Sequence, residues 1–384
     1  MKMSVPFGGR DPVVIIAGTP WDGMLASERQ LGAQLAAFGP VVYVDPPVSR
    51  SWPTLSRPQI DQPHPGVTRI TPNGVRGMYR PLAHHAIAPL VAHAVKRQLN
   101  LAGVKPRAVM VAAPLAILSH FPESRHIVYA TDDWIVGAGL MGLPEDRMRW
   151  VQRRHLETAD LVIAVSDVLA ERYRSAGHPA VEVVANGCDL DTLDGVDRAQ
   201  PVQNVDLPKP IAGFLGNLSD RIDLSYLEAV AERGVSTLLV GPRRAQFGGD
   251  RFDRLVARPN VRWVGPQPYE RMPSYLRLID VGMTPYSPTE FNKSSSPLKT
   301  LEYLAAGRGS VATDLPGVRS LGTPLVAIET NPEAFADAVE ATLAMDRTPE
   351  LVAARRAAAA PHSWERKALR VADLLGLATP VNLP

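Results

Sequence analysis

Short, wholly apolar segments alternate along this chain with longer segments in which apolar residues recur at helical spacing. Residues 13–17 form the first apolar segment, residues 27–38 the first helical one, and residues 41–44 the next apolar one. Wholly apolar segments are typical of strands buried on both faces, and a strand–helix–strand unit predicts a parallel sheet with a right-handed crossover. We expect Ser27 to cap the first helix.

The alternation continues to about residue 190, with one exception. Residues 49–77 are interrupted by prolines and show no regular pattern, so we predict an irregular loop there. Ser166, followed by Asp167, is expected to start a helix. The remaining strands of this half are predicted at residues 108–112, 127–130, 161–165 and 181–184, and its helices at residues 82–99, 145–158 and 166–176.

A second alternating series follows a break in the pattern. Residues 191–210 carry acidic residues and prolines, and we place the domain boundary there, between residues 195 and 196. Two such series predict an α/β protein with two doubly wound, parallel-sheet domains facing each other across a cleft, with ligands outside the carboxyl ends of the strands. The second series has strands predicted at residues 211–215, 237–240, 261–264, 281–284, 310–313 and 326–328, and helices at 224–233, 272–278 and 297–306.

Composition narrows the class of protein. The chain has 384 residues, of which 45% are hydrophobic and 21% charged, as is typical of folded globular proteins, and the length suits two domains. Its 36 prolines exceed the usual share of about 5% and argue against a coiled coil or a helical bundle. A net charge of +2 does not indicate a nucleic-acid partner.

The cysteine content and the lengths of the apolar segments indicate the cellular compartment in which the protein is expected. The single cysteine, Cys188, excludes an internal disulfide and a cysteine-based zinc site, and it fits a reducing environment. The first residues contain no apolar signal-peptide core, and no segment approaches the roughly 18 apolar residues of a membrane-spanning helix. We therefore expect a cytoplasmic protein.

The most specific pattern lies in residues 291–311, where three serines and Pro297 precede a helical stretch. Serine is a common N-cap and proline a common first helical residue, so we predict that a helix starts here and offers free N–H groups to a diphosphate. Lys293 and Lys299 add positive charge, and Glu302 lies about one turn further on, where a carboxylate can accept hydrogen bonds from ribose hydroxyls. The structural alternative is a capped amphipathic helix with solvated lysines.

The run from Pro297 to Lys299, followed by residues 302–307 (EYLAAG), resembles the donor-binding motif of glycosyltransferase family four. Further matches occur in the family's order along almost the whole chain. They are residues 186–189 (NGCD), residues 213–216 (GFLG) with Arg221 near the family's phosphate-binding residue, and residues 363–365 (SWE) at the start of the last helix.

The resemblance implies the GT-B fold, with two Rossmann-like domains. Residues 1–195 would form the acceptor-side domain and residues 196–360 the donor domain, and a helix in residues 361–384 would return to the first domain. It also implies a retaining transferase that takes a nucleoside-diphosphate sugar, first of all a UDP-sugar, as its donor substrate and requires no metal or other cofactor.

The resemblance further implies roles for individual residues. Arg221, Lys293 or Lys299, and the helix start would stabilise the charge that develops on the diphosphate, and Arg221 and Lys299 are therefore expected to be catalytic. Asp132 or Asp133, which follow a strand of the first domain, would orient the acceptor hydroxyl or act as its base. The donor-binding residues expected on this basis are Gly18, Gly216, Asn217, Arg221, Pro242, Val264, Ser295, Ser296, Leu298, Lys299 and Glu302.

One position departs from the family's pattern. The family usually places a second glutamate eight positions before the one at Glu302, and Ser294 stands there in this chain. The departure leaves the nucleotide assignment in place and bears on the contact with the sugar. Glu290 lies nearby, at a different spacing.

Several of these assignments have structural alternatives. For Asp132 and Asp133 the alternative is a helix cap followed by a buried Trp134. The D-x-D sequence that begins at Asp189 is expected to cap a loop rather than to bind a metal. Arg243 and its neighbour Arg244 follow a predicted strand, where a phosphate contact and a solvated pair are equally compatible with the sequence.

Residues 50–107 contain nine Lys or Arg and a single acidic residue, Asp61. Such a segment indicates a phosphate-bearing or lipid-linked acceptor, or peripheral contact with the inner face of an anionic membrane, and the structural alternative is a solvated basic face. His84, His85 and His93 have the spacing of a helix surface and no carboxylate partner, so we expect no metal site there.

Two classes of function follow. The first is a retaining glycosyltransferase that moves a sugar to a hydroxyl of a glycan, glycolipid or natural product. The second is a catalytically altered protein of the same fold: a nucleotide-sugar epimerase, a pseudo-glycosyltransferase or a silent nucleotide-sugar-binding protein. The sequence argues against a Rossmann dehydrogenase, because no predicted strand is followed by G-x-G-x-x-G and a downstream acidic residue.

Overall fold

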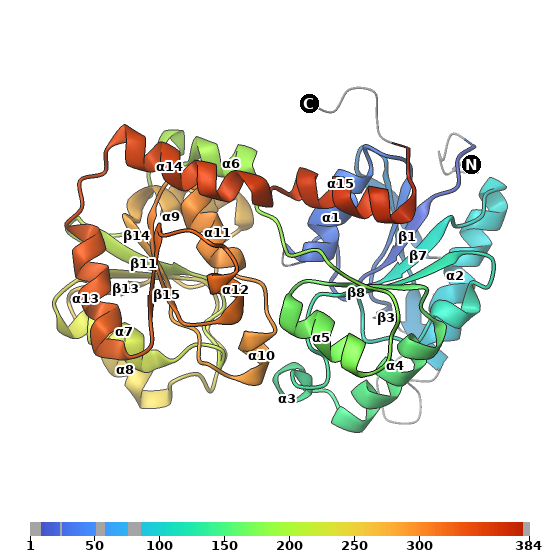
Figure 1. The fold of residues 1–384 in the computed structure, drawn as a ribbon, viewed down its shortest axis with the longest axis horizontal. Coiled ribbons are helices and arrows are strands. Elements are labelled where there is room, and N and C mark those ends of the chain that lie inside the picture. The colour runs from blue at the N-terminus through green and yellow to red at the C-terminus, as the bar shows by residue number, and fades with distance from the viewer. Residues whose placement is uncertain (1–8, 24, 51–57, 76–85, 379–384) are drawn as a thin grey trace. The chain divides into compact units, whose positions relative to one another are not determined.

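The computed structural model describes residues 9–23, 25–50, 58–75 and 86–378, which divide into two compact units (Figure 1). The first unit comprises Met1–Ala185 and Trp364–Pro384, and the second comprises Asn186–Ser363. The boundaries expected at 195/196 and 360/361 therefore fall at 185/186 and 363/364. The physical reason for the first difference is that Leu193 and Val196 are buried in the core of the second unit.

The first unit is built on an eight-stranded sheet of order β10-β9-β8-β7-β1-β2-β5-β4. All neighbouring strands are parallel except β4 and β5, and the order reverses between β1 and β7. Its strands are β1 (Val13–Ile16), β2 (Val41–Val44), β4 (Gln59–His64), β5 (Val67–Thr71), β7 (Ala108–Val111), β8 (Arg125–Ala130), β9 (Leu161–Ala164) and β10 (Val181–Val183).

The irregular loop predicted over residues 49–77 is wrong for most of the described residues there. β4 and β5 extend the main sheet, and β3 (Val48–Arg50) pairs with β6 (Asn73–Val75) in a small second sheet. β4 is an edge strand with mostly exposed residues, so its sequence lacks the apolar run that marks the central strands.

Helices cover the first unit's sheet. Ser166 caps α5 by accepting a hydrogen bond from the N–H of Leu169, as predicted. Ser27 is the first residue of α1 rather than its cap, because Ala26 is the residue with extended backbone. The helices are α1 (Ser27–Leu35), α2 (Ile87–Ala102), α3 (Ala138–Met141), α4 (Glu145–Thr158), α5 (Asp167–Ser175) and α15 (Trp364–Leu375), with a 3₁₀ turn at Leu118–His120.

The second unit has a six-stranded, wholly parallel sheet of order β13-β12-β11-β14-β15-β16. The order reverses between β11 and β14, and in doubly wound sheets of this order ligands bind at the carboxyl ends beside that reversal. Its strands are β11 (Ile211–Leu215), β12 (Ser236–Val240), β13 (Val261–Trp263), β14 (Val281–Thr284), β15 (Gly309–Thr313) and β16 (Val326–Glu329).

Two apolar cores fill the two faces of this sheet. One includes residues of α9, α11 and α14, and the other includes residues of α7, α8 and α13. The helices are α6 (Leu190–Asp194), α7 (Leu224–Glu232), α8 (Gly249–Val256), α9 (Met272–Leu278), α10 (Glu290–Lys293), α11 (Leu298–Ala305), α12 (Pro316–Arg319), α13 (Pro332–Leu343) and α14 (Pro349–Ala359), with 3₁₀ turns at Gly195–Arg198, Tyr269–Arg271 and Ala360–His362.

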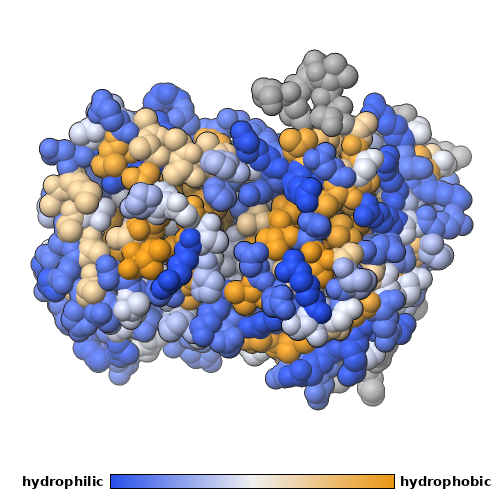
Figure 2. Space-filling view, in the orientation of Figure 1, coloured by the Kyte–Doolittle hydropathy of each residue, from blue (hydrophilic) through white to orange (hydrophobic). Residues whose placement is uncertain are grey.

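Hydrophilic residues dominate the visible surface, interspersed with smaller apolar areas (Figure 2). Within the described ranges, the structure contains no helix with both the length and the apolar character needed to cross a bilayer.

Tyr303 seats α11 on the second unit's sheet. Its side chain is fully buried, and its hydroxyl accepts a hydrogen bond of 3.0 Å from the backbone N–H of Leu215, at the end of β11. Its ring lies directly on Gly282 of β14, where an added Cβ would fall 2.1 Å from the ring. The side chain therefore fixes α11 against both strands that flank the reversal.

Replacing Gly282 by alanine tests this seat. The new Cβ overlaps the enclosed ring of Tyr303, so the helix must shift or the ring must leave its rotamer. We expect the free energy of unfolding to fall by about 1–3 kcal/mol, measured by thermal or urea denaturation. Gly195→Ala is the control, because a Cβ there meets no atom within 4 Å. Equal melting temperatures for the two variants would contradict the close packing of the Tyr303 ring on Gly282.

Candidate active site

The loops after β11, β12 and β13 meet at the carboxyl edge of the second unit's sheet. The N–H of Gly216 donates to the carbonyl of Val240 at 2.9 Å, and that of Leu218 donates to the carbonyl of Pro242 at 2.8 Å. Gly241 has φ +134°, and a Cβ on it would lie 2.0 Å from the Gly216 oxygen, so only glycine allows this approach. The structure thus brings together four sequence-predicted positions: Gly216, Asn217, Pro242 and Val264.

Arg221 is held rigidly beside these loops. Its guanidinium carbon lies 5.3 Å from the centre of the Tyr286 ring and 4.9 Å from that of Phe291. Its Nε donates to Asn292 Oδ1 at 2.9 Å, and its Nη2 donates to Ser295 Oγ at 3.1 Å. Nη1 has no protein acceptor within the described ranges. The arrangement therefore presents one oriented donor and a full positive charge.

The start of α11 differs from the prediction. The helix begins at Leu298, with Pro297 as the N-cap residue, and no side chain caps it. Ser294 and Ser295 donate their hydroxyls to the carbonyl of Phe291, and Ser296 Oγ accepts from the N–H of Asn186. The serines are therefore used to shape the loop, and the first turn of α11 keeps N–H groups without a side-chain acceptor, which suits an anion.

Lys299 and Glu302 form an ion pair on the first turn of α11. Nζ of Lys299 and Oε2 of Glu302 are 2.8 Å apart, and both side chains are largely buried. Burial acts to lower the pKa of Lys299, but the charge and hydrogen bond of Glu302 outweigh it, so the pKa is raised. Lys299 therefore stays protonated at the start of α11.

Ser294, which stands where the family usually has a glutamate, is enclosed by the protein. Ser294 is buried, and it is the C-cap residue of α10. Glu290 instead pairs with Lys293 at 2.9 Å, in an exposed ion pair. A buried hydroxyl therefore occupies the position from which the family's glutamate would contact a sugar.

Two other sequence candidates have structural roles. Asp189 caps α6, accepting hydrogen bonds from the N–H and the hydroxyl of Thr192 at 3.1 and 2.7 Å. Arg243 stacks on Phe252 at 4.4 Å and pairs with Asp253 at 2.6 Å. Among the described residues, no three His, Cys, Asp or Glu side chains gather as metal ligands. His84 and His85 lie outside those residues.

The first unit carries a buried acid at the carboxyl edge of its sheet. Glu28 is 4% exposed, and its Oε1 accepts a hydrogen bond of 3.2 Å from the N–H of Thr19, in the loop after β1. Gly18 passes close by, since a Cβ there would lie 3.8 Å from Oε1 of Glu28. Burial raises the pKa of Glu28, and the charge of Asp132 adds to the increase. The sequence analysis overlooked Glu28, although it shares the helical face of Leu31 and Leu35.

The neighbouring residues Asp132 and Asp133 have different surroundings in the structure. Asp133 is buried, accepts a hydrogen bond of 3.0 Å from the N–H of Val136 and pairs with Arg172. Trp134 is also buried, so for Asp133 the structural alternative holds: a turn cap followed by a core tryptophan. Asp132 acts electrostatically on Glu28, which associates it with the Gly18 loop.

Part of the basic segment 50–107 is neutralised. Arg69 pairs with Asp22 and with Asp61, and Lys105 pairs with Glu123 at 2.6 Å. Arg57, Arg76 and Arg80 lie outside the described residues.

Comparisons of the sequence with known proteins find similarity to glycosyltransferases. A family model described as glycosyl transferases group 1 covers residues 209–345. A Bacillus subtilis (strain 168) protein named as the teichuronic acid biosynthesis glycosyltransferase TuaH is 32% identical over 180 residues, which are 45% of this chain and 45% of that protein. The chain therefore spans less than half the length of this curated relative. The chain resembles group 1 glycosyltransferases.

Solved structures show the fold as GT-B. Sucrose-phosphate synthase from Thermosynechococcus elongatus superposes with a TM-score of 0.74 at 19% identity, covering 95% of this chain and 98% of that one. Anabaena HepE, solved in complex with UDP and glucose, has a TM-score of 0.67 at 16% identity, with coverage of 95% and 99%.

The group 1 match contains the residues of the second unit that the sequence predicted to bind the donor. Arg221, the three serines and the Lys299–Glu302 pair all lie within residues 209–345, whereas Gly18, Glu28 and Asp132 lie outside that range. The family-model match thus covers the predicted donor-binding residues of the second unit and not the candidates of the first unit.

Glu28 predicts an unusual pH dependence of stability. A carboxyl with a raised pKa in the folded state costs stability as pH rises above its unfolded pKa, near 4.5, because the unfolded chain then releases its proton first. Glu28→Gln keeps the oxygen that accepts from Thr19 and removes this cost. We expect its melting temperature to gain on that of the wild type between about pH 4.5 and pH 8, measured by scanning calorimetry.

Glu157→Gln is the control for this series, because Glu157 lies in an exposed ion pair with Arg154. A Glu28→Gln variant that loses stability relative to the wild type as pH rises would show that the folded protein favours ionised Glu28.

Proposed function

We propose that this chain is a retaining glycosyltransferase that moves a sugar from a nucleoside-diphosphate sugar, with UDP as the favoured nucleotide, to a hydroxyl group. The observation that carries the proposal is Arg221, clamped between two aromatic rings with Nη1 unpaired, beside the uncapped start of α11. The similarity to HepE, whose structure holds UDP and glucose, supports the choice of donor.

The diphosphate is the group that this arrangement suits. As the bond between the anomeric carbon and the β-phosphate oxygen breaks, negative charge develops on that oxygen. Arg221, protonated Lys299 and the first-turn N–H groups of α11 are fixed in advance, so they can stabilise this charge without reorganising. Because these groups supply the positive charge, we propose that no metal is required.

The nucleoside would be held by Glu302. Its Oε2 accepts from Lys299, and its carboxylate retains lone pairs that can accept hydrogen bonds from ribose hydroxyls. The loops at Gly216, Pro242 and Val264 offer backbone groups at the same edge of the sheet. Leu298 begins the helix whose N–H groups would meet the phosphates.

For the acceptor we assign Asp132, which acts electrostatically on Glu28 beside the Gly18 loop, to orient the hydroxyl or to take its proton. Asp133 is assigned the structural role of pairing with Arg172. Lys96 and Arg97 are exposed on α2. They support the proposal that the acceptor bears a phosphate or a lipid, or that the protein contacts the inner face of a membrane peripherally.

A catalytically altered protein of the same fold is the second candidate. It is favoured by one observation: the buried hydroxyl of Ser294 in place of the sugar-contacting glutamate. Release of free UDP without a glycosylated product would point to an epimerase or pseudo-glycosyltransferase. Donor binding without turnover across a panel of acceptors would point to a silent binding protein.

Arg221→Gln tests the donor site. Loss of the charge and of the Nη1 donor should weaken UDP binding by about 10–100-fold, since a hydrogen bond to a charged group contributes about 1.5–3 kcal/mol. Isothermal titration calorimetry with UDP, GDP, ADP and dTDP measures this and ranks the bases. Arg258→Gln is the matched control, because Arg258 pairs with Glu232 in an exposed ion pair. Equal affinities of the two variants would remove Arg221 from the donor site.

Metal independence is tested separately. We expect UDP affinity and sugar transfer to be unchanged by EDTA, because fixed cationic side chains take the metal's place. The anomeric configuration of the product, read by NMR coupling constants, tests retention. Activity that vanishes in EDTA and returns with a divalent cation would contradict the first expectation.

A further inference from the structure

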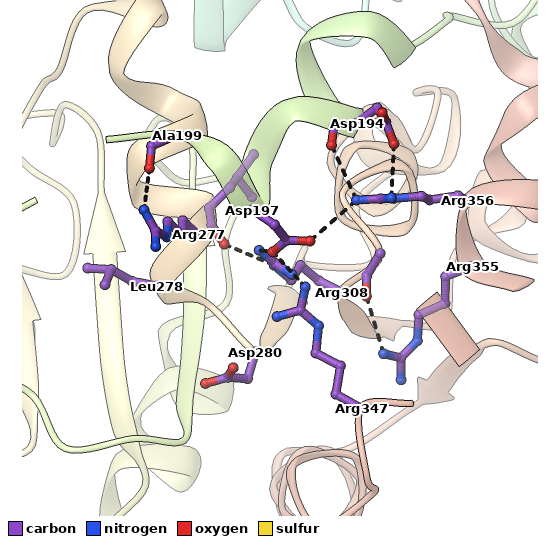
Figure 3. Close-up of polar contacts among 12 residues, drawn as sticks. Asp194, Asp197, Ala199, Arg277, Leu278, Asp280, Arg308, Arg347, Arg355 and Arg356 are labelled. Atoms are coloured by element: carbon purple, nitrogen blue, oxygen red, sulfur yellow. Dashed lines mark hydrogen bonds and ion pairs between the residues drawn. The ribbon is translucent and has the colours of Figure 1, made fainter. Parts of the chain in front are cut away.

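A second group of arginines lies at the opposite, amino-terminal edge of the second unit's sheet. Arg308 directly precedes β15, and Arg347, Arg355 and Arg356 lie in or just before α14. Figure 3 shows the side chains of Arg308, Arg347 and Arg356 around Asp197 and Asp194, with Arg355 nearby. Three guanidinium groups, those of Arg308, Arg347 and Arg356, contact the two carboxylates, and Arg355 contacts the carbonyl of Gly307.

Both carboxylates are fully engaged. Asp197 Oδ1 accepts from Nη2 of Arg308 and from Nη2 of Arg347, each at 2.8 Å, and its Oδ2 lies 3.4 Å from Nη2 of Arg356. Nη1 of Arg356 pairs with Asp194 at 2.9 Å. The acceptors of this cluster are therefore shared among several donors.

Among the described residues, several buried N–H donors of this arginine cluster lack a hydrogen-bond acceptor. Arg308 is 0% exposed and Arg355 is 5% exposed. Nη1 of Arg308, Nε of Arg355 and Nε of Arg356 are all buried and have no acceptor among the residues that the structure describes. Arg355 has one hydrogen bond, a long one of 3.4 Å to the carbonyl of Gly307. Such buried donors are rarely left without a partner.

The cluster also carries more positive than negative charge, with four arginines and two aspartates. Burial and the nearby charge of Arg347 lower the pKa of Arg355, which means that positive charge around it is not fully compensated. Arg308 and Arg355 are enclosed, but the side chains of Arg347 and Arg356 are 31% and 30% exposed, so the cluster is open to solvent on their side.

We propose that these four arginines form a binding site for a phosphate group, either inorganic phosphate or the end of a sugar monophosphate. A phosphate brings about two negative charges and three acceptor oxygens, which match the excess charge and the unpaired donors. The planar fork of arginine binds such oxygens two at a time. The site is separate from the proposed diphosphate site, because Arg221 and Lys299 belong to the carboxyl edge of the same sheet.

Titration of the full-length protein with inorganic phosphate tests the site. We expect one phosphate to bind in the wild type and also in Arg221→Gln, which removes a main cation of the other anion site. Arg347→Gln should weaken binding at least tenfold, because it removes one charge and one fork from the open side of the cluster. Arg347→Lys keeps the charge and should lose less. Arg258→Gln is the matched control and should bind as the wild type does.

Calorimetry gives the affinity, and thermal shift in sodium chloride of equal ionic strength separates binding from screening. Should Arg347→Gln fail to fold, Arg356→Gln takes its place, and ³¹P NMR of the wild type still counts the bound phosphates. Glucose 6-phosphate in a parallel titration shows whether the site prefers a sugar monoester. The proposal is overturned if phosphate stabilises the wild type no more than chloride does, or if Arg347→Gln and Arg258→Gln bind it equally.

Discussion

The contact between the Tyr303 ring and Gly282 positions α11 on the sheet of the second unit. The absence of a side chain at Gly282 lets α11 lie directly on β14, and the Tyr303 hydroxyl ties the same helix to the end of β11. These two strands flank the reversal in strand order, so the start of α11 is fixed at the place where doubly wound sheets bind ligands. Arg221 and the serine loop are arranged around the start of this helix.

This one helix also connects the two cationic clusters. Lys299 and Glu302 lie in the first turn of α11, and Gly307 and Arg308 follow its last turn, about 12 Å further along for eight residues. In both clusters a buried cation is accompanied by a carboxylate: Glu302 for Lys299 and Asp197 for Arg308. The carboxylate suffices for Lys299, whose pKa is raised, and does not suffice around Arg355, whose pKa is lowered.

The sequence predicted the buried strands well, because apolar runs are local signals. It failed where the outcome depends on neighbours distant in the chain. The serines before Pro297 look like caps, but Phe291 and Asn186 take their hydroxyls. The strands β4 and β5 are polar enough to resemble a loop, since only pairing with β2 makes them part of a sheet.

Glu28 and Glu302 show how one residue type acquires two properties from its surroundings. Glu302 lies against the cation of Lys299, whereas Glu28 is buried with backbone N–H groups and has no cationic partner among the described residues. A carboxyl without a cation in a dry site favours its protonated form, and a protonated carboxyl can donate as well as accept a hydrogen bond. Because Asp132 adds negative charge beside it, ionising both acids at once is unfavourable. Glu28, beside the Gly18 loop, therefore stays protonated to a higher pH than a free glutamate does, and in that form it can donate a hydrogen bond.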